Sequence, residues 1–224
     1  MFINGVSIEE YGAELRTSYK CGGVEISSNV YQGRNRSAFI LLNQTYGLKQ
    51  LTLPLVIEAD SMQELTLKKS MLDGAMFGKE IELIMDDGFL YKVYLSDIGD
   101  VVYQNEKLIE CDYTCIGYRH GEMMEIKEPY QNIVVCNSTV PYTDVIISAT
   151  ASVASNAYQL GTVTFTEVKA GDELTVDGIK KRILVNGAPG AQYATWITFP
   201  TLKPGQNTIQ CIDAITAQYQ PIYF

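Results

Sequence analysis

The chain has 224 residues, with 17 basic side chains against 26 acidic ones, so its formal net charge at pH 7 is −9. Hydrophobic residues make up 46% and charged residues 19%, which is typical of a chain with a buried core and excludes a disordered protein. The acidity argues against a nucleic-acid binder, because contacts with phosphates need clustered Lys and Arg. No apolar run of about 20 residues occurs and no basic segment leads into one at the start, so we expect neither a membrane span nor a secretory signal.

The first part of the chain predicts strands and one helix. Alternating apolar residues over 51–57 predict a strand, and Pro54 places it at a sheet edge or a bulge because proline cannot donate to a ladder. Ser61 and Glu64 have the spacing of a capping box, which predicts a helix over about 61–77. Four residues at helical spacing form a stripe that we expect to pack on the sheet: Met62, Leu65, Leu72 and Met76.

A hairpin is predicted after this helix, over about 81–95. Its turn is Asp86-Asp87-Gly88, where glycine tolerates a positive φ. Another strand is expected over 107–116.

A domain boundary is predicted within 121–132, which is charged and contains Pro129. We therefore divide the chain into domains 1–130 and 131–224. The first holds 12 basic and 20 acidic residues, a net charge of −8, and the second holds 5 and 6, a net charge of −1.

The second domain predicts seven short strands divided by glycine turns and no helix, a pattern that is typical of a β-sandwich. The expected strands are 133–136, 145–149, 158–165, 173–176, 182–185, 194–199 and 207–212.

Residues that could carry catalysis are few. His120 is the single histidine, and the sequence has no G-x-S-x-G elbow, so we expect a solvated histidine and no enzyme. No phosphate-binding glycine motif occurs, so no cofactor is expected. The five cysteines form no C-x-x-C pair, which favours reduced, buried thiols over disulfides or a metal site. They are Cys21, Cys111, Cys115, Cys136 and Cys211.

Three segments resemble a known family. Residues 171–177 read GDELTVD, residues 184–187 read LVNG and residues 199–209 read FPTLKPGQNTI. This ordered pattern is similar to the C-terminal domain of distal tail proteins, structural components of long-tailed (siphovirus-type) bacteriophages. The opening Phe2-Ile3-Asn4-Gly5, Gly12 and Gly33-Arg34 resemble the start of the same family. The resemblance implies structural roles for ten motif residues: Gly171, Asp172, Asp177, Asn186, Gly187, Phe199, Pro200, Pro204, Gly205 and Asn207.

The resemblance implies a mainly β fold: an N-terminal β-sandwich with one helix and an extended hairpin, followed by a galectin-like C-terminal β-sandwich. It implies a ring of six copies at the virion tail tip, made from chains synthesised in the cytoplasm of the bacterial host. Such a ring joins the tail tube protein to a tail-associated lysin or tip fibre protein. Further partners implied are the tape measure protein and receptor-binding proteins.

Two hypotheses concern this ring. Because open sheet edges tend to find partners, we expect the turn Asp86-Asp87-Gly88 or the first strand, Phe2-Ile3, to reach a neighbouring subunit. Six copies of the first domain would bring a charge of −48, which would let DNA pass through the channel without binding. The alternative is that these carboxylates lie on the outer surface and aid solubility.

A carbohydrate-binding, lectin-like adhesion module is the alternative function. The galectin sugar site resembles H-x-N-x-R followed by W-x-x-E-x-R. Residues 131–224 contain no histidine, and Phe199 stands three positions after Trp196, where the pattern has Glu. The sugar-binding residues therefore do not transfer, and we expect Trp196 to lie in the core or in an interface.

Overall fold

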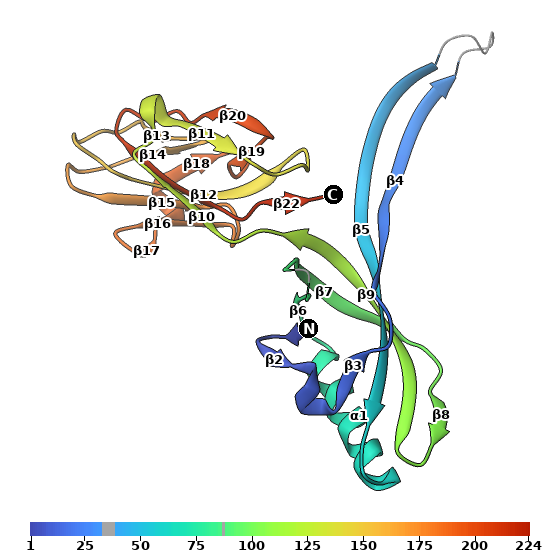
Figure 1. Ribbon diagram of the computed structural model, residues 1–224. Coiled ribbons are helices and arrows are strands. Elements are labelled where there is room, and N and C mark those ends of the chain that lie inside the picture. Colours follow the sequence, from blue (N-terminus) through green and yellow to red (C-terminus); the bar gives the residue numbers. More distant parts are fainter. Residues whose placement is uncertain (33–38, 87) are drawn as a thin grey trace. The chain divides into compact units, whose positions relative to one another are not determined.

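The structure, a computed structural model, describes residues 1–32, 39–86 and 88–224 (Figure 1). The chain forms two compact units: unit 1 is residues 1–119 with Phe224, and unit 2 is residues 120–223. This division lies earlier than the predicted boundary at 130, because Met124–Lys127 pairs with Ile215–Tyr219 of unit 2. No helix in the described ranges is long and apolar enough to cross a membrane.

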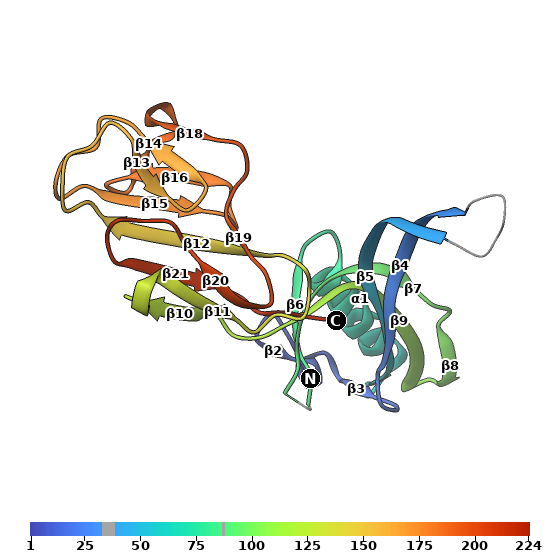
Figure 2. The same cartoon turned by 90° about the horizontal axis from the view of Figure 1, so that it is seen from above.

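Unit 1 is a curled antiparallel sheet that wraps around one α-helix (Figure 2). The strand order is β2-β1-β6-β7-β9-β5-β3, with β4 joined to β5 and β8 joined to β9. Its elements are β1 (Phe2–Ile3), β2 (Val6–Ser7), the 3₁₀ helix η1 (Ile8–Tyr11), β3 (Ala13–Leu15), β4 (Lys20–Gln32), β5 (Phe39–Glu58), α1 (Met62–Met76), β6 (Ile81–Ile84), β7 (Leu90–Ile98), β8 (Val102–Asn105) and β9 (Leu108–His120).

Helix α1 begins with the cap that the sequence indicates. The Ser61 Oγ accepts the Glu64 N–H over 3.3 Å, and the Glu64 carboxylate accepts the Asp60 N–H over 3.1 Å. Leu65, Leu72 and Met76 are buried, whereas Met62 is 42% exposed and lies outside the packed stripe. The helix therefore buries a narrower face than the sequence predicts.

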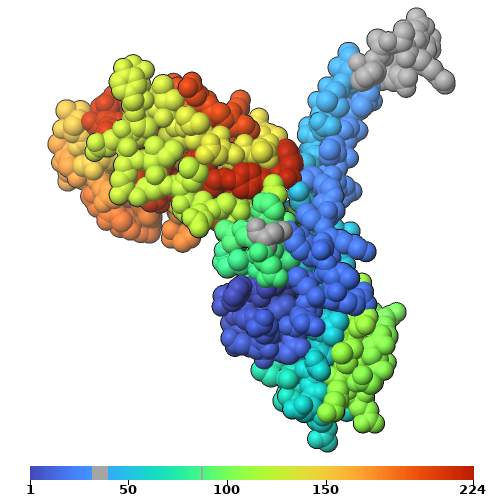
Figure 3. Space-filling model, in the orientation of Figure 1, coloured from blue at the N-terminus to red at the C-terminus, as the bar shows by residue number. Residues whose placement is uncertain are grey.

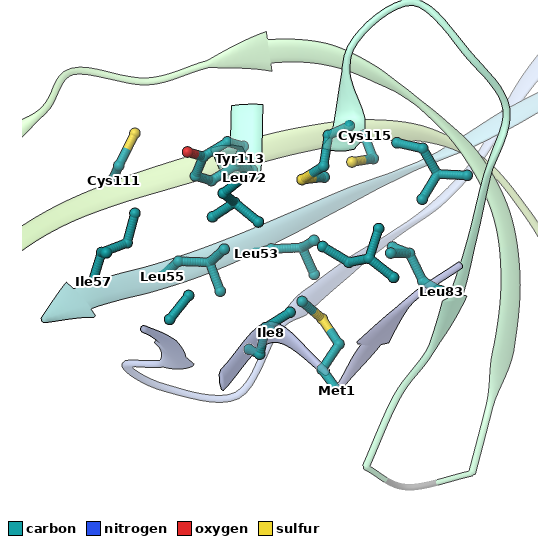
Figure 4. Close-up of a cluster of buried hydrophobic side chains, with 14 of the residues drawn as sticks. Met1, Ile8, Leu53, Leu55, Ile57, Leu72, Leu83, Cys111, Tyr113 and Cys115 are labelled. Carbon is teal, nitrogen blue, oxygen red and sulfur yellow. The ribbon is translucent and has the colours of Figure 1, made fainter. Parts of the chain in front are cut away.

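The core of unit 1 lies between α1 and the central strands (Figure 4). Leu53, Leu55 and Ile57 of β5 pack there beside Tyr113 of β9. The Tyr113 hydroxyl donates to Asp73 Oδ1 over 2.6 Å, which ties the helix to the sheet. Burial, with the Asp73 carboxylate beside it, raises the pKa of the Tyr113 hydroxyl well above its usual value, so this donor keeps its proton.

Pro54 lies in an internal strand, so the expectation of an edge strand is wrong. β5 pairs with β9 over residues 49–58 and with β3 on its other side. The Pro54 carbonyl accepts the Arg16 N–H over 2.9 Å. In an antiparallel ladder, the N–H and C=O groups of one residue point toward the same neighbouring strand. Since the Pro54 carbonyl faces Arg16, the position of its missing N–H faces the same segment, after β3. No hydrogen bond between β5 and β9 is therefore lost.

The extended hairpin is formed by β4 and β5. The hairpin over 81–95 is present as β6 and β7, but its register covers only Ile81–Ile84 against Leu90–Val93. By contrast, β4 pairs with β5 from Lys20–Thr52 to Gln32–Phe39 (Figure 1). Three register shifts interrupt this ladder, and they break the alternation by which the sequence would reveal it.

Unit 2 is built from several antiparallel sheets around its own core. The largest has the order β10-β21-β12-β15-β16-β17, with β19 on β12; β11 pairs with β20, and β13, β14 and β18 form a third sheet. The elements are β10 (Met124–Lys127), η2 (Tyr130–Asn132), β11 (Ile133–Cys136), β12 (Thr143–Thr150), β13 (Tyr158–Leu160), β14 (Val163–Phe165), β15 (Glu173–Asp177), β16 (Arg182–Val185), β17 (Ala188–Pro189), η3 (Ala191–Tyr193), β18 (Ala194–Trp196), β19 (Thr201–Leu202), β20 (Gly205–Thr208), β21 (Ile215–Tyr219) and β22 (Ile222–Tyr223).

Two features of unit 2 differ from expectation. Residues 158–165 form a hairpin, β13 and β14, in place of one strand. β21 was not predicted, although it pairs with both β10 and β12 and buries Ile215, Ala217 and Tyr219.

Candidate functional site: assembly surfaces

The outer part of the β4–β5 hairpin is a two-stranded ribbon with exposed apolar side chains. β5 pairs with β9 only from Lys49 onward, so within the described residues its stretch 39–48 has β4 as its sole strand partner. The space-filling view shows this ribbon as a slender blue arm (Figure 3). Its exposed large apolar residues are Ile26, Val30, Tyr31, Ile40, Leu41, Leu42, Tyr46 and Leu48.

One face of this ribbon carries two apolar pairs, with the polar pair Ser28 and Gln44 between them. Ile26 lies opposite Tyr46, and Val30 lies opposite Leu41. Residues two apart on a strand share a face, and so do directly opposed residues. These four side chains therefore share one face, which we call the apolar ribbon face. The other face carries the polar residues Ser27, Asn29, Asn43 and Thr45, followed by the exposed pair Tyr31 and Ile40 toward the outer end.

Such a ribbon needs a partner to be stable in water. An isolated two-stranded hairpin is only marginally stable in water. Its two open edges and exposed apolar side chains promote association with other chains. Ile26 is 62% exposed and Ile40 is 60% exposed, so the chain itself does not cover them. Tyr46 has partial cover from the Phe224 ring, whose centroid lies 4.9 Å from its own.

The first strand is used inside unit 1. β1 lies between β2 and β6, with Ile3 opposite both Val6 and Leu83, so it has no open edge. Ile3 belongs to the core, and only the side chain of Phe2 is exposed.

The turn between β6 and β7 also has an internal role. Asp86 forms an ion pair with the N-terminal ammonium of Met1. Gly88 adopts φ +81°, and its N–H donates to the Met85 carbonyl over 2.9 Å. Asp87 lies outside the described residues, as do Gly33 and Arg34. A subunit contact through this turn or through β1 remains a prediction.

Four motif residues of unit 2 form a corner at the start of β15. Asp172 accepts the Lys169 N–H over 2.8 Å and the Asn186 side-chain amide over 3.0 Å. Asn186 Oδ1 accepts the Glu173 N–H over 2.8 Å. Asn186 and Gly187 have φ values of +52° and +76°, which are the values a two-residue hairpin turn of the I′ type requires. Gly171 precedes them at φ +89°.

The remaining motif residues lie around the turns at 177–180 and 199–207. Asp177 accepts the Lys180 N–H over 2.8 Å and an Arg182 N–H over 3.0 Å. Asn207 bridges its own loop: its Oδ1 accepts the Lys203 N–H, and its Nδ2 donates to the Lys203 and Gly205 carbonyls. Pro200 is buried, and Phe199 meets Trp196 edge-on at 6.0 Å between ring centroids. Pro204 lies in the loop that Asn207 closes.

The residues considered for catalysis and sugar binding are dispersed. His120 is 3% exposed, so the expectation of a solvated histidine is wrong; its Nδ1 lies 2.8 Å from the Gly121 carbonyl oxygen and 2.8 Å from Gln220 Nε2. Trp196 is 40% exposed and is therefore not a core residue. No group of three metal-ligating side chains occurs in the part of the chain that the structure describes.

The cysteines are all free thiols. Cys111, Cys115 and Cys136 are buried, Cys211 is half-buried, and Cys21 is exposed, which differs from the expectation of buried thiols. Burial raises the pKa of the Cys115 thiol to about 12, so it stays protonated.

Comparison with known proteins finds a family model that is similar to unit 2. Residues 132–223 match the family described as "Siphovirus-type tail component, C-terminal domain". The match contains every motif residue named above, and it confirms the resemblance to distal tail proteins. Among curated protein sequences, none matches the chain.

The fold of the whole chain is similar to that of the Dit protein (gp 19.1) of phage SPP1, whose structure is described as a paradigm of the hub adsorption apparatus in phages that infect Gram-positive bacteria. The two chains are 12% identical, with a TM-score of 0.74 over 99% of this chain and 98% of that one. This likeness confirms the predicted mainly β fold class. Two structures of the phage p2 baseplate, activated with Ca or Sr, match with a TM-score of 0.46 at 8% and 9% identity, over 92% of this chain and 91% of theirs.

The apolar ribbon face is the surface that sequence reasoning missed. Its signal is present in the run Phe39-Ile40-Leu41-Leu42 and in Val30-Tyr31, which are β-forming residues with no helical or alternating pattern. Glycines at 22, 23 and 47, together with the bulges, obscure the strand periodicity between them.

Proposed function

We propose that the chain is a distal tail protein that closes, as six copies, into a ring-shaped hub at the tip of a siphovirus-type tail. The observation that carries the proposal is the apolar ribbon face, which unit 1 presents without covering it. Two comparisons support a place in a phage tail: the match of residues 132–223 to a family of siphovirus-type tail components, and the fold shared with SPP1 Dit. The role is structural, and the proposal assigns no catalytic residue.

Ring closure would bury the exposed apolar side chains of the ribbon in every copy. Association buries apolar side chains at about 25 cal/mol for each Å² removed from water. A contact between two different patches closes into a ring when the rotation between subunits fits, and it leaves no free end. The ribbon thus takes the role that the sequence had suggested for the 81–95 hairpin.

In this proposal the ring joins the tail tube protein to a tail-associated lysin or tip fibre protein, contacts the tape measure protein, and docks receptor-binding proteins through unit 2. Exposed apolar side chains at the open edge of β18 support such docking. Trp196 is 40% exposed, Tyr193 is 42% exposed and Ile197 is 97% exposed. Exposed groups of this kind mark protein contact sites.

The acidity of the first domain fits a DNA channel. A wall with six copies of a −8 charge would repel phosphates and prevent the counterion-releasing contacts that hold DNA. If the carboxylates instead lie on the outer surface, neutralising them would change solubility and leave the passage of DNA unaffected.

Two neighbouring residues on opposite faces of β4 test the role of the ribbon. In the full-length protein, Ile26→Asp places a charge on the apolar ribbon face, whereas Ser27→Asp places the same charge on the polar face. Sedimentation velocity should show that Ile26→Asp dissociates the ring and that Ser27→Asp leaves it assembled. Equal behaviour of both variants would contradict a role for this face.

A further inference from the structure

The outer side of helix α1 is a second apolar surface that the chain leaves uncovered. Leu67 and Met71 are four residues apart, Gly74 follows three later, and this spacing places all three on one side of the helix. Leu67 is 60% exposed and Met71 is 52% exposed. The buried residues of the helix, Leu65 and Leu72, hold the opposite side against the sheet.

The packing around Gly74 within its own chain leaves room for a larger residue. It lies inside α1, and a Cβ built there meets nothing within 4 Å. Glycine in a helix interior is destabilising relative to alanine because its backbone loses more freedom on folding. A residue that weakens the helix and is not required by its packing instead suits the close approach of another backbone to the helix surface.

Within the proposed ring, electrostatics limit which surfaces of two neighbouring copies can meet. Residues 1–119 hold 11 basic and 17 acidic side chains, so two copies repel each other except where their surfaces are neutral. On α1 the charges cancel, because Lys68 pairs with Glu64 at 3.0 Å and Lys69 pairs with Asp73 at 2.7 Å. The apolar ribbon face carries no charge at Ile26, Val30, Leu41 or Tyr46.

The two surfaces also agree in length. From Ile26 to Val30 the ribbon spans about 13 Å at about 3.3 Å per strand residue. From Leu67 to Gly74 the helix spans about 10 Å at 1.5 Å per residue. Each chain thus carries one ribbon and one receiving helix side, the pair of different patches that a head-to-tail ring requires.

We propose that the apolar ribbon face of one copy packs across Leu67, Met71 and Gly74 of helix α1 in the next copy. The proposal rests on the ring described above and names the surface that receives the ribbon. Gly74 lets the ribbon backbone approach the helix beyond the two larger side chains, toward the C-terminal end of α1.

A graded substitution of Gly74 in the full-length protein tests the contact. Gly74→Ala and Gly74→Leu add side chains where the isolated chain has open space, and both residues are better helix formers than glycine. Under monomeric conditions at high dilution, the melting temperature should rise for both variants. The dissociation constant of the ring should increase at least tenfold for Gly74→Leu and less for Gly74→Ala.

Cross-linking tests the identity of the two surfaces. In a Cys21→Ser background, one variant carries Val30→Cys and a second carries Met71→Cys. A short bismaleimide should join them only when the two variants are mixed and assembled, since a head-to-tail contact never brings two ribbons together. Ser27→Cys, on the polar face of the ribbon, should give no product with Met71→Cys.

The outcomes separate this contact from the ring itself. If the wild-type chain forms a ring, but Gly74→Leu assembles with unchanged affinity and the mixture does not cross-link, the helix contact is wrong and the ring stands. A wild-type chain that is monomeric at every concentration contradicts the proposed function first, and the contact with it.

Discussion

The side-chain amide of Asn186 donates a hydrogen bond to the carboxylate of Asp172 over 3.0 Å. The same amide group accepts the N–H of Glu173, so the turn after β16 is fastened to the start of β15 through side chains as well as through the ladder. Both residues lie in the motif by which the sequence resembles the distal tail family. This contact explains why the motif contains these two residues, because they fix a corner of unit 2 without needing a ligand.

Gly187 should be the least replaceable residue of this corner. Its φ of +76° is unfavourable for any residue with a Cβ, so Gly187→Ala should destabilise unit 2 by about 1 kcal/mol. Trp196, the single tryptophan, lies in unit 2, so its fluorescence during urea unfolding reports this change. Gly171→Ala, at φ +89°, is the matched variant on the other side of the corner. An unchanged midpoint in both variants would show that the turn geometry is not needed.

Asp172 and Asp177 are among the carboxylates through which unit 2 should lose stability in acid. The Asn186 hydrogen bond, with that of the Lys169 N–H, lowers the pKa of Asp172. Burial by itself would raise the pKa of Asp177, but the Lys180 N–H and the Arg182 guanidinium outweigh it and hold this pKa below its usual value. A lowered native pKa contributes stability above the unfolded value of about 3.9, and this contribution disappears as pH falls through the native pKa.

Urea unfolding at pH 6 and at pH 3, followed by Trp196 fluorescence, measures this loss. The difference between the two pH values should be smaller in Asp177→Asn than in the wild type. Glu122→Gln, which removes an exposed carboxylate, serves as the control. A wild-type chain that is equally stable at both pH values would contradict the assignment.

Tyr113→Phe should loosen helix α1 from the sheet of unit 1. It removes the buried hydroxyl that donates to Asp73, while Asp73 keeps its ion pair with Lys69. The loss of one hydrogen bond to a charged acceptor should cost about 1.5 kcal/mol. Hydrogen exchange of the α1 amides should accelerate, while the Trp196 transition of unit 2 stays unchanged. If exchange in α1 is unaffected, the bond does not hold the helix.

Thiol titration checks the burial of the cysteines. In the native monomer, Cys21 should react rapidly with a disulfide reagent, Cys211 slowly, and the three buried thiols only after unfolding. In the folded chain Cys115 also has little thiolate at mildly alkaline pH, because burial raises its pKa to about 12. All five should react in denaturant. Rapid native reaction of more than two thiols would contradict the packing of β9 or β11.

Local signals in the sequence were the most reliable. The cap of α1 depends on Ser61 and Glu64, which are three residues apart, and the turn at Asn186-Gly187 depends on two adjacent residues. Interactions of this kind involve only near neighbours, so the sequence alone can reveal them. The resemblance of the motif to a known family then allowed the architecture of unit 2 to be predicted as well.

Features that depend on distant partners could not be predicted. Pro54 looks like an edge residue until β9 and Arg16 show which side its missing N–H faces. His120 ends the long strand β9 beside Gln220, one hundred positions away, and this contact buries it. The apolar ribbon face could not be recognised either, because an exposed apolar run has the same sequence as a buried one.

The most direct test of the proposed ring is the native mass of the purified full-length chain, combined with negative-stain images of the same sample. We expect an assembly of about 149 kDa, six times the chain mass of 24.9 kDa, that appears as an annulus with a central opening. A single species at 24.9 kDa across the whole concentration range, with no annuli in the images, would contradict it.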